Sequence, residues 1–331
     1  MPRLKLVSTG GTIACLPGEN GLIPALTGSQ LLEYADTPAF DVDCVDLFSM
    51  DSSNIQPKEW RVIAEEIKKS VEQGYDGVIV THGTDTMAYT ASMLNFMLLN
   101  IPIPVVMTGS QYPIVRPDSD GRKNLKDALI AARRMAGGVY ICFGDALILG
   151  CRAVKTRTVS RNAFESINYP YIGTVANDAY VELYPHRPNG EFQFFDAIDE
   201  RVALIKLIPG TSPAILEMLL NCDVKGVVVE AFGLGGVHNF RRDHAESIKK
   251  LVKGGIPVVL TSQCLYEAST PDIYEVSHAL REAGVISAAD MTTEAAVTKL
   301  MYALGHTKDL LEIRAKMQTD LCGELGVVAG E

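Results

Sequence analysis

The feature that most restricts the fold is an alternation of two kinds of segment along the chain. Short apolar runs rich in β-branched residues end in Gly, Thr or Ser, and longer stretches with helical periodicity follow them. This alternation is typical of βαβ units, in which parallel strands form a sheet covered by helices. In the first half, examples of predicted strands are 4–8, 77–81, 104–108 and 139–143, and the predicted helices are 57–73, 85–98 and 122–135. The apolar spacing in 57–73 places Trp60, Ile63, Ala64, Ile67 and Val71 on one face.

A second alternation starts at residue 202. Before it, residues 184–201 contain two prolines, a glycine and several charges without sustained periodicity, which favours a linker. The later predicted strands are 202–207, 226–230 and 257–261, and the later predicted helices are 212–220, 243–252, 275–283, 293–303 and 308–317. We therefore predict an α/β protein with a larger N-terminal domain (1–183), a linker (184–201) and a smaller C-terminal α/β domain (202–331). The larger domain should hold a mainly parallel sheet flanked by helices.

The composition excludes several classes of protein. A chain of 331 residues, 47% of them hydrophobic, can bury a large core, which argues against disorder. The net charge of -10, with no basic run, argues against nucleic acid or an anionic membrane surface as a partner. No stretch reaches the ~18 apolar residues that span a bilayer, and the first apolar run is too short for a secretory signal. Seven scattered cysteines, mostly in apolar runs, fit buried thiols, so we expect a soluble cytoplasmic protein.

Two of the predicted strands end in loops that present threonine. Residues 8–14 (STGGTIA) follow the first strand, and their glycine pair lets the backbone turn sharply and leaves Thr12 unobstructed. Residues 81–86 (THGTDT) end strand 77–81 and lead into a helix. Turn and helix-cap chemistry explains either loop alone. Two such loops at the carboxyl ends of strands in one sheet, where ligands bind, favour a shared site.

A threonine hydroxyl is a weak nucleophile near neutral pH and needs a positioned base, which can be a desolvated lysine. Lys155, in GCRAVKT at 150–156, is the candidate. The alternative is an ordinary surface charge, because most lysines are solvated. His82 lies inside the second loop, and we expect it to orient the backbone rather than to act as a base.

Other motifs indicate neither a cofactor nor a metal. The string GLGGVH at 233–238 begins like a dinucleotide fingerprint but ends in histidine, and no P-loop lysine follows a glycine cluster. The six histidines include no HExxH motif, and no cysteine pair has zinc spacing. We therefore expect a cofactor-free protein without a bound metal.

At these loops the sequence resembles the L-asparaginase family. The strings TGGTIA, THGTDTMAYTAS, VVMTGSQ, SDGRKNL and ADMTTEAAVTKL stand at successive positions where that family carries very similar strings. The first two are highly specific together, and the resemblance covers essentially the whole chain. The string MDSS at 50–53, together with SQC and ADMTTEA near the end, is most similar to the cytoplasmic type I branch.

The resemblance implies an amidohydrolase that converts L-asparagine to L-aspartate and ammonia through a threonine-linked acyl-enzyme. Carried over position by position, Thr12 resembles the nucleophile of the first loop. Thr84 and Asp85 resemble the catalytic pair of the second loop, and Lys155 falls at the position of the catalytic lysine. Which threonine attacks first stays open at this point.

The resemblance also implies how the substrate is held. Ser52 falls at the position that binds the α-carboxylate of asparagine, with Asp51 lining the same pocket. Thr84 and Asp85 also belong to the binding site, and Asp85 would hold the α-ammonium. This division fits asparagine, which carries both charges on one carbon and needs donors on one side and a carboxylate on the other.

The sequence departs from the best-known family pattern at the loop after the first threonine. Many members carry a tyrosine there, whereas this chain has Leu22. A tyrosine that resembles one of the type I branch is Tyr274, which would be lent from a neighbouring subunit. This implies a homodimer or homotetramer with active sites near the subunit interface. The alternative for Tyr274 is an ordinary half-buried aromatic residue.

Two other functions remain open from the sequence. One is the asparaginase-like subunit of a tRNA-dependent amidotransferase, which releases ammonia for a partner. That family carries an additional N-terminal domain, whereas the first predicted strand here starts at about residue 4, which favours the hydrolase. The other is a non-catalytic asparagine-binding protein. Binding alone does not require two threonines and a lysine, which again favours an enzyme.

Overall fold

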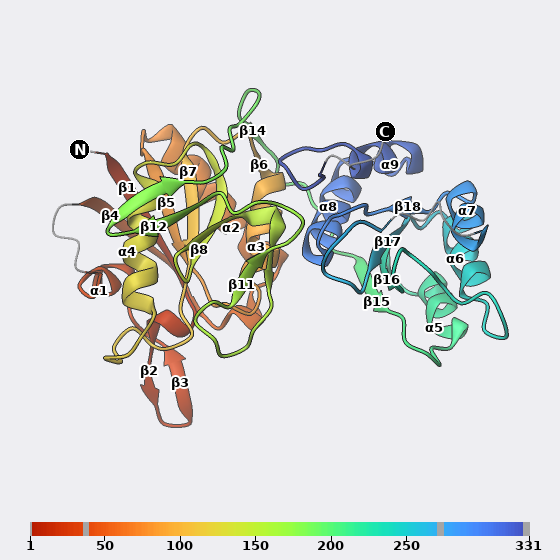
Figure 1. Ribbon diagram of the computed structural model, residues 1–331, viewed down its shortest axis with the longest axis horizontal. Helices are drawn as coiled ribbons and strands as arrows, with labels where there is room; N and C mark the ends of the chain where they lie inside the picture. The colour runs from red at the N-terminus through yellow and green to blue at the C-terminus, as the bar shows by residue number, and fades with distance from the viewer. Residues whose placement is uncertain (1, 36–39, 270–274, 327–331) are drawn as a thin grey trace. The chain divides into compact units, whose positions relative to one another are not determined.

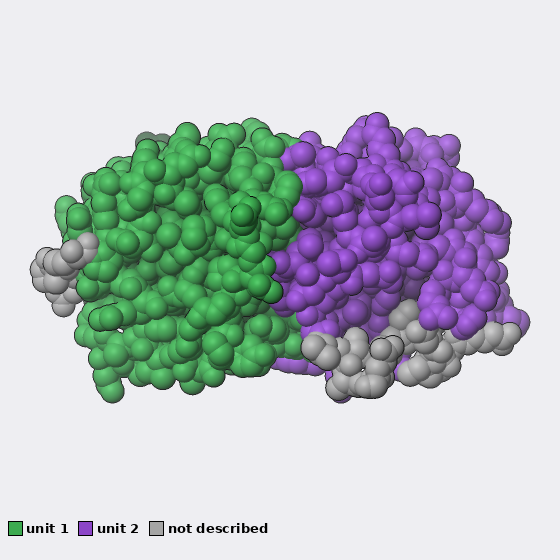
Figure 2. Space-filling view, turned by 90° about the horizontal axis from the view of Figure 1, so that it is seen from above, with its two compact units in different colours: residues 1–196 green, residues 197–331 purple. Residues whose placement is uncertain are grey.

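The structure is a computed structural model that describes residues 2–35, 40–269 and 275–326. The chain divides into two compact units, residues 1–196 and 197–331 (Figure 1, Figure 2). The division falls inside the segment 184–201, which the sequence predicts as a linker. Each unit has its own sheet and its own buried residues.

Unit 1 is built on an eight-stranded sheet with the order β13-β12-β9-β8-β7-β5-β1-β4. Five neighbouring strands run parallel, namely β4 (Asp41–Met50), β1 (Arg3–Gly10), β5 (Gly77–Thr81), β7 (Pro104–Thr108) and β8 (Gly138–Phe143). Antiparallel pairing then adds β9 (Ala146–Leu149), β12 (Gly173–Ala176) and β13 (Ala179–Glu182) at one edge. Every residue of β5 and β7 is buried, as expected for parallel strands covered on both faces.

Helices flank this sheet (Figure 1). They are α1 (Gly28–Leu32), α2 (Pro57–Glu72), α3 (Met87–Met97) and α4 (Gly121–Ala132), with the short 3-10 helices η1 (Thr12–Ala14), η2 (Ser52–Asn54) and η3 (Gly150–Arg152). Helix α2 is amphipathic, and its buried residues include Trp60, Ile63, Ala64 and Ile67 of the predicted face, whereas Val71 is half-buried. Helix α3 begins at Met87 rather than at residue 85, because residues 82–86 form an irregular loop at the sheet edge.

Short antiparallel pairs complete unit 1. They are β2 (Cys15–Gly18) with β3 (Gly21–Pro24), β6 (Leu98–Leu99) with β14 (Gln193–Phe194), and β10 (Ala153–Lys155) with β11 (Phe164–Ser166). The pairing of β14 with β6 attaches part of segment 184–201 to unit 1.

Unit 2 contains a four-stranded parallel sheet of β15 (Val202–Lys206), β16 (Gly226–Ala231), β17 (Val258–Ser262) and β18 (Ile286–Ser287). Its helices are α5 (Pro213–Met218), α6 (His244–Lys253), α7 (Glu275–Glu282), α8 (Thr293–His306) and α9 (Leu310–Gln318), with the 3-10 helix η4 (Leu219–Asn221). Apolar side chains from the strands and α6 form its core, among them Val227, Val229, Ile248, Leu251, Val258 and Leu260.

The predicted fold class is confirmed: a larger N-terminal α/β unit with a mainly parallel sheet precedes a smaller α/β unit. The expectation that the cysteines are mostly buried is only partly right. All seven are free, but only Cys15, Cys142 and Cys151 are buried, whereas Cys44 and Cys322 are half-buried and Cys222 and Cys264 are exposed. Cys222 directly follows η4 and Cys264 lies two residues after β17, so apolar neighbours in the sequence did not imply burial.

A buried ion pair attaches residues 319–326 to α8. The side chains of Lys299 and Glu324 are both 0% exposed, and Lys299 Nζ lies 2.5 Å from Glu324 Oε1. The same ammonium donates to the carbonyl oxygens of Met317 at 3.1 Å and Thr319 at 2.6 Å. Lys299 therefore binds free carbonyls at the end of α9 as well as the carboxylate.

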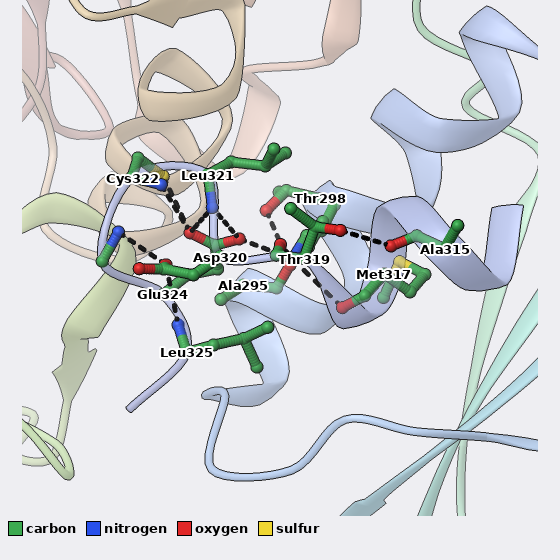
Figure 3. Close-up of polar contacts among 12 residues, drawn as sticks. Ala295, Thr298, Ala315, Met317, Thr319, Asp320, Leu321, Cys322, Glu324 and Leu325 are labelled. Atoms are coloured by element: carbon green, nitrogen blue, oxygen red, sulfur yellow. Dashed lines mark hydrogen bonds and ion pairs between the residues drawn. The ribbon is translucent and has the colours of Figure 1, made fainter. Parts of the chain in front are cut away.

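The turn that follows α9 surrounds its own carboxylates with N–H groups (Figure 3). Glu324 accepts the backbone N–H groups of Leu321 at 3.0 Å and Cys322 at 2.8 Å. Asp320 accepts two further N–H groups of this turn. Burial raises the pKa of the Glu324 carboxyl, but Lys299 and the N–H donors outweigh this effect and leave the pKa below its ordinary value. Glu324 therefore stabilises the fold above its unfolded-state pKa, and this contribution disappears as the pH falls through its folded-state pKa.

Replacing Lys299 with methionine is expected to lower the free energy of unfolding by about 3–5 kcal/mol, because Glu324 would be left as an unpaired buried charge. The exposed pair of Lys68 and Glu72 provides a matched control. Lys68→Met should cost less than about 1 kcal/mol. Urea denaturation of both variants measures the difference. A double variant, Lys299→Met with Glu324→Leu, should recover most of the loss, and equal losses in the two single variants would contradict the prediction.

Candidate active site

Three loops that follow neighbouring parallel strands meet at one edge of the unit 1 sheet. Strand β1 lies between β4 and β5. Ser8 is in register with Thr81 of β5, and Gly10 is in register with Met50 of β4. Segments 10–12, 50–52 and 82–85 therefore leave the sheet side by side at its carboxyl edge. This is the edge at which the sequence predicts the site.

Glycine allows these loops to touch. Gly11 has a φ of 76°, and a Cβ atom added to it would lie 2.4 Å from the backbone nitrogen of Gly83. A Cβ atom added to Gly83 would lie 2.5 Å from Ser52 Oγ. A Cβ atom would not tolerate such distances, so the first and second loops approach each other through bare backbone, and the backbone of Gly83 lies against the Ser52 side chain. The glycines thus serve a close approach between loops as well as the sharp turn that the sequence predicts.

Lys155 joins the second threonine loop although it lies about 70 positions later in the chain. It is the last residue of β10, and its Nζ donates to Thr84 Oγ1 at 2.8 Å and to Asp85 Oδ1 at 2.6 Å. Thr84 is buried, and the Lys155 side chain is 16% exposed, whereas that of Asp85 is 64% exposed. The alternative of a solvated surface lysine is therefore wrong. The arrangement can move a proton between a hydroxyl and an amine while the carboxylate faces outward.

Thr12 differs from Thr84 in its contacts. It begins η1 directly after Gly11 and is half-buried. Its hydroxyl forms no hydrogen bond with any residue that the structure describes. Thr12 is thus close in the fold to the second loop but is not tied to Lys155, and its oxygen is left available to a bound molecule.

Asp51 and Ser52 occupy the third loop. The Asp51 carboxylate caps η2 by accepting the Ser53 N–H at 2.8 Å and the Ser53 hydroxyl at 2.6 Å, which holds the pKa of Asp51 below its ordinary value. Ser52 is buried, and its carbonyl accepts the Thr86 hydroxyl at 2.7 Å. The third loop is therefore attached to the second through Thr86, with Ser52 Oγ against Gly83.

Of the two residues that bear on the missing loop tyrosine, the structure describes Leu22 but not Tyr274. Leu22 lies on the β2–β3 hairpin, with 56% of its surface exposed. It has no group that could take or give a proton. Tyr274 lies outside the described residues, so its role stays a prediction.

The structure also reveals a residue to which the sequence assigned no role. Asp120 is buried just before α4, and its carboxylate accepts the N–H groups of Gln111 at 2.9 Å and Tyr112 at 3.1 Å. The same loop contacts η1, where the Ile114 N–H donates to the Ile13 carbonyl at 3.2 Å. Asp120 thus supports the loop beside Thr12. In the sequence it is indistinguishable from an ordinary helix cap.

Within the described ranges, no group of three or more His, Cys, Asp or Glu side chains is arranged to hold a metal ion. The helices in the described part of the chain are also too short or too polar to cross a membrane.

Comparisons with protein families and with known proteins show which family the chain belongs to. Residues 3–188 match the family described as Asparaginase, N-terminal, and residues 201–317 match the Glutaminase/Asparaginase C-terminal domain. The chain is 42% identical over 329 residues to the L-asparaginase of Thermococcus kodakarensis, covering 98% of this chain and 99% of the relative. It is 38% identical over 341 residues to a glutamyl-tRNA(Gln) amidotransferase subunit of Pyrococcus abyssi, covering 98% of this chain and 77% of the relative.

Solved structures agree with these matches. The thermostable L-asparaginase from Thermococcus kodakarensis superposes with a TM-score of 0.94 at 41% identity, covering 98% of this chain and 99% of the other. L-asparaginase I from Vibrio cholerae superposes with a TM-score of 0.85 at 32% identity, covering 99% and 100%. The resemblance recognised in the motifs is confirmed, and the chain belongs to the asparaginase family.

Proposed function

We propose that this chain hydrolyses the side-chain amide of L-asparagine to L-aspartate and ammonia. The observation that carries the proposal is the contact of Lys155 Nζ with both Thr84 Oγ1 and Asp85 Oδ1, two residues of the loop that packs against the loop of Thr12. A threonine hydroxyl beside an amine is a proton-transfer unit, and an exposed carboxylate next to it can bind an ammonium group. A relative that spans the whole chain is named L-asparaginase, which supports the same substrate.

In the proposed mechanism, the Thr12 oxygen attacks the amide carbon and forms a tetrahedral intermediate. The carbon–nitrogen bond then breaks, ammonia leaves with the hydroxyl proton, and a β-aspartyl ester remains on Thr12. Water attacks this ester, aspartate leaves, and a proton returns to Thr12. We favour Thr12 as the attacking group because its hydroxyl has no partner among the described residues, whereas Lys155 already holds Thr84. Thr84 would relay protons to and from the reacting groups.

Lys155 must give up a proton before it can accept one. In the free protein its ammonium is paired with Asp85. When the α-ammonium of asparagine pairs with Asp85, it competes with Lys155 for that carboxylate and weakens the ion pair. Substrate binding would then prepare the lysine for proton transfer. Ser52 Oγ, on the loop beside Gly83, would donate to the α-carboxylate at the other end of the same substrate carbon.

The purified chain should release ammonia from asparagine without ATP, tRNA or a second protein. An amidotransferase subunit would release ammonia efficiently only with its partner, and a binding protein would bind asparagine without releasing ammonia. The measurement is coupled detection of ammonia with asparagine and, separately, with glutamine. Binding without turnover, or turnover only after a partner subunit is added, would contradict the proposal.

Replacing Asp85 with asparagine is expected to weaken asparagine binding by about tenfold or more, because an amide cannot replace a carboxylate opposite an ammonium group. Calorimetric titration in a Thr12→Ala background measures binding without turnover. Asp178→Asn is the control, because Asp178 is an exposed carboxylate that pairs with Lys126 and belongs to none of the three loops. Equal effects of the two changes would contradict the assignment of the ammonium to Asp85.

We also propose that the protein acts in the cytoplasm as a homodimer or homotetramer, with Tyr274 supplied to the site of a neighbouring subunit. The seven free cysteines support a reducing compartment. The lack of a hydroxyl at Leu22 supports the need for another proton acceptor near Thr12.

A further inference from the structure

A buried chain of hydrogen bonds leads from α2 through α3 to the loop that carries Thr84. Trp60 Nε1 on α2 lies 3.0 Å from Thr90 Oγ1 on α3, and these helices pack against each other (Figure 1). Thr90 Oγ1 lies 3.0 Å from His82 Nε2, and His82 Nδ1 lies 2.7 Å from the Gly83 carbonyl oxygen. His82 and Thr90 are 0% exposed and Trp60 is 6% exposed. The chain of bonds thus lies beneath the site, shielded from solvent.

The groups at the two ends of this chain of hydrogen bonds determine which atom donates and which accepts in each bond. A carbonyl oxygen can only accept, so His82 Nδ1 must carry a proton and donate to Gly83. Burial lowers the pKa of the His82 ring to about 4, so the ring is neutral near pH 7 and its Nε2 is an acceptor. The Thr90 hydroxyl must then donate to Nε2. The Trp60 indole can only donate, and it donates to the Thr90 oxygen.

The last bond, from His82 Nδ1 to the Gly83 carbonyl oxygen, restrains the peptide group that leads to Thr84. The Gly83 carbonyl belongs to the planar peptide between Gly83 and Thr84, so holding this oxygen holds the Thr84 nitrogen and Cα as well. Glycine has the widest backbone freedom of any residue, and position 83 requires glycine because a Cβ atom there would lie against Ser52. The loop therefore needs a restraint from outside its own backbone, and His82 supplies one.

We propose that His82 is a positioning residue, which Trp60 and Thr90 hold in the Nδ1–H tautomer so that it orients the Gly83–Thr84 peptide. This inference rests on the proposed function, because the orientation matters through the 2.8 Å contact between Thr84 Oγ1 and Lys155 Nζ. A shift of the peptide moves the hydroxyl away from the amine. Displacements of about 1 Å in catalytic groups can cost about 100-fold in rate.

Two substitutions at His82 distinguish a role in orienting the Gly83–Thr84 peptide from a role in filling space in the core. The side-chain N–H of asparagine branches from the same carbon position as His82 Nδ1 and can reach the Gly83 carbonyl, whereas leucine fills more volume but has no donor. We expect His82→Leu to lower kcat by about 10- to 100-fold with little change in KM. His82→Asn should retain more of the kcat, even if it is the less stable variant in thermal unfolding. A kcat for His82→Leu equal to or above that of His82→Asn would overturn the proposal.

A spectroscopic test follows the hydrogen bonds without using activity. Trp60 is the only tryptophan of the chain, so its indole N–H gives a single NMR signal. With nitrogen-labelled histidine, the wild-type His82 ring should carry its proton on Nδ1. Thr90→Val should move the indole signal and lower kcat, and Thr90→Ser should restore both. A proton on Nε2 in the wild type, or an unchanged kcat in Thr90→Val with a displaced indole signal, would overturn the proposal.

These outcomes are distinguishable from a failure of the proposed function. If the wild-type protein released no ammonia from asparagine, the proposed function would fail, while the tautomer and the indole signal would still show whether the hydrogen bonds run in the inferred direction. If the wild type is active and the tautomer is correct, the ratio of kcat between His82→Asn and His82→Leu decides the positioning role.

Discussion

Replacing Thr12 with alanine is expected to lower ammonia release from asparagine by more than about 1,000-fold, because no acyl-enzyme can form without the attacking oxygen. The fold should survive the change. Thr12 is half-buried at the start of η1, and its hydroxyl bonds to none of the described residues, so its removal leaves little cavity and no unpaired group. The measurements are turnover by ammonia detection and the thermal unfolding midpoint.

Thr12→Ser is the matched control, because it keeps the oxygen and removes only a methyl group. It should retain a measurable part of the activity. Wild-type turnover in Thr12→Ala, with a normal unfolding midpoint, would remove Thr12 from the mechanism and leave Thr84 as the candidate nucleophile. Loss of activity with a strongly lowered midpoint would instead indicate a structural role for Thr12.

Replacing Lys155 with methionine is expected to lower kcat by several orders of magnitude with little change in KM. The change removes the amine that contacts Thr84 Oγ1, while Asp85 loses its partner and becomes free to bind the substrate ammonium. Methionine has a similar length and no charge, so the buried stem of the side chain remains packed. Steady-state kinetics over a range of asparagine concentrations separate the two constants.

Lys155→Arg tests whether the charge or the exchangeable proton matters. A guanidinium keeps the pairing with Asp85 but is not deprotonated in proteins, so it cannot accept a proton. We therefore expect this variant to be nearly as inactive as Lys155→Met. Substantial activity in Lys155→Arg would make the residue an electrostatic partner of Asp85. A large rise in KM with an unchanged kcat for Lys155→Met would make it a binding residue.

Much of the fold could be predicted because local periodicity reports which face of an element is buried. The apolar spacing of Trp60, Ile63 and Ile67 predicted the buried side of α2, and the apolar run 77–81 predicted a strand, all of whose residues are buried in the structure. Strand β4 was not predicted, because its sequence DVDCVDLFSM mixes acidic and apolar residues and most of its side chains are only partly buried. A strand at the edge of a sheet needs little hydrophobicity and leaves a weak signal.

For the site, the sequence was sufficient to locate the two threonine loops. Each loop follows a strand directly, so a short stretch of residues carries both the strand and the polar turn after it. The roles of Thr12, Thr84, Asp85 and Lys155 stay proposals. Helix α3 was predicted to begin at Asp85, because an acidic residue after threonine resembles a helix start, whereas the carboxylate of Asp85 binds Lys155 instead.

The sequence by itself determined the succession of strands and helices, the α/β class and the two threonine loops, because these properties depend on residues that are neighbours in the chain. Only the tertiary structure decided which distant groups touch. Lys155 reaches Thr84 because the β10–β11 pair directs its ammonium toward the sheet edge, and Lys299 is buried although most lysines are exposed. Neither position has a local pattern that distinguishes it from a surface lysine. A charge is buried where a matching carboxylate or hydroxyl from another segment offsets the loss of water, and the packing of segments alone brings that partner into place.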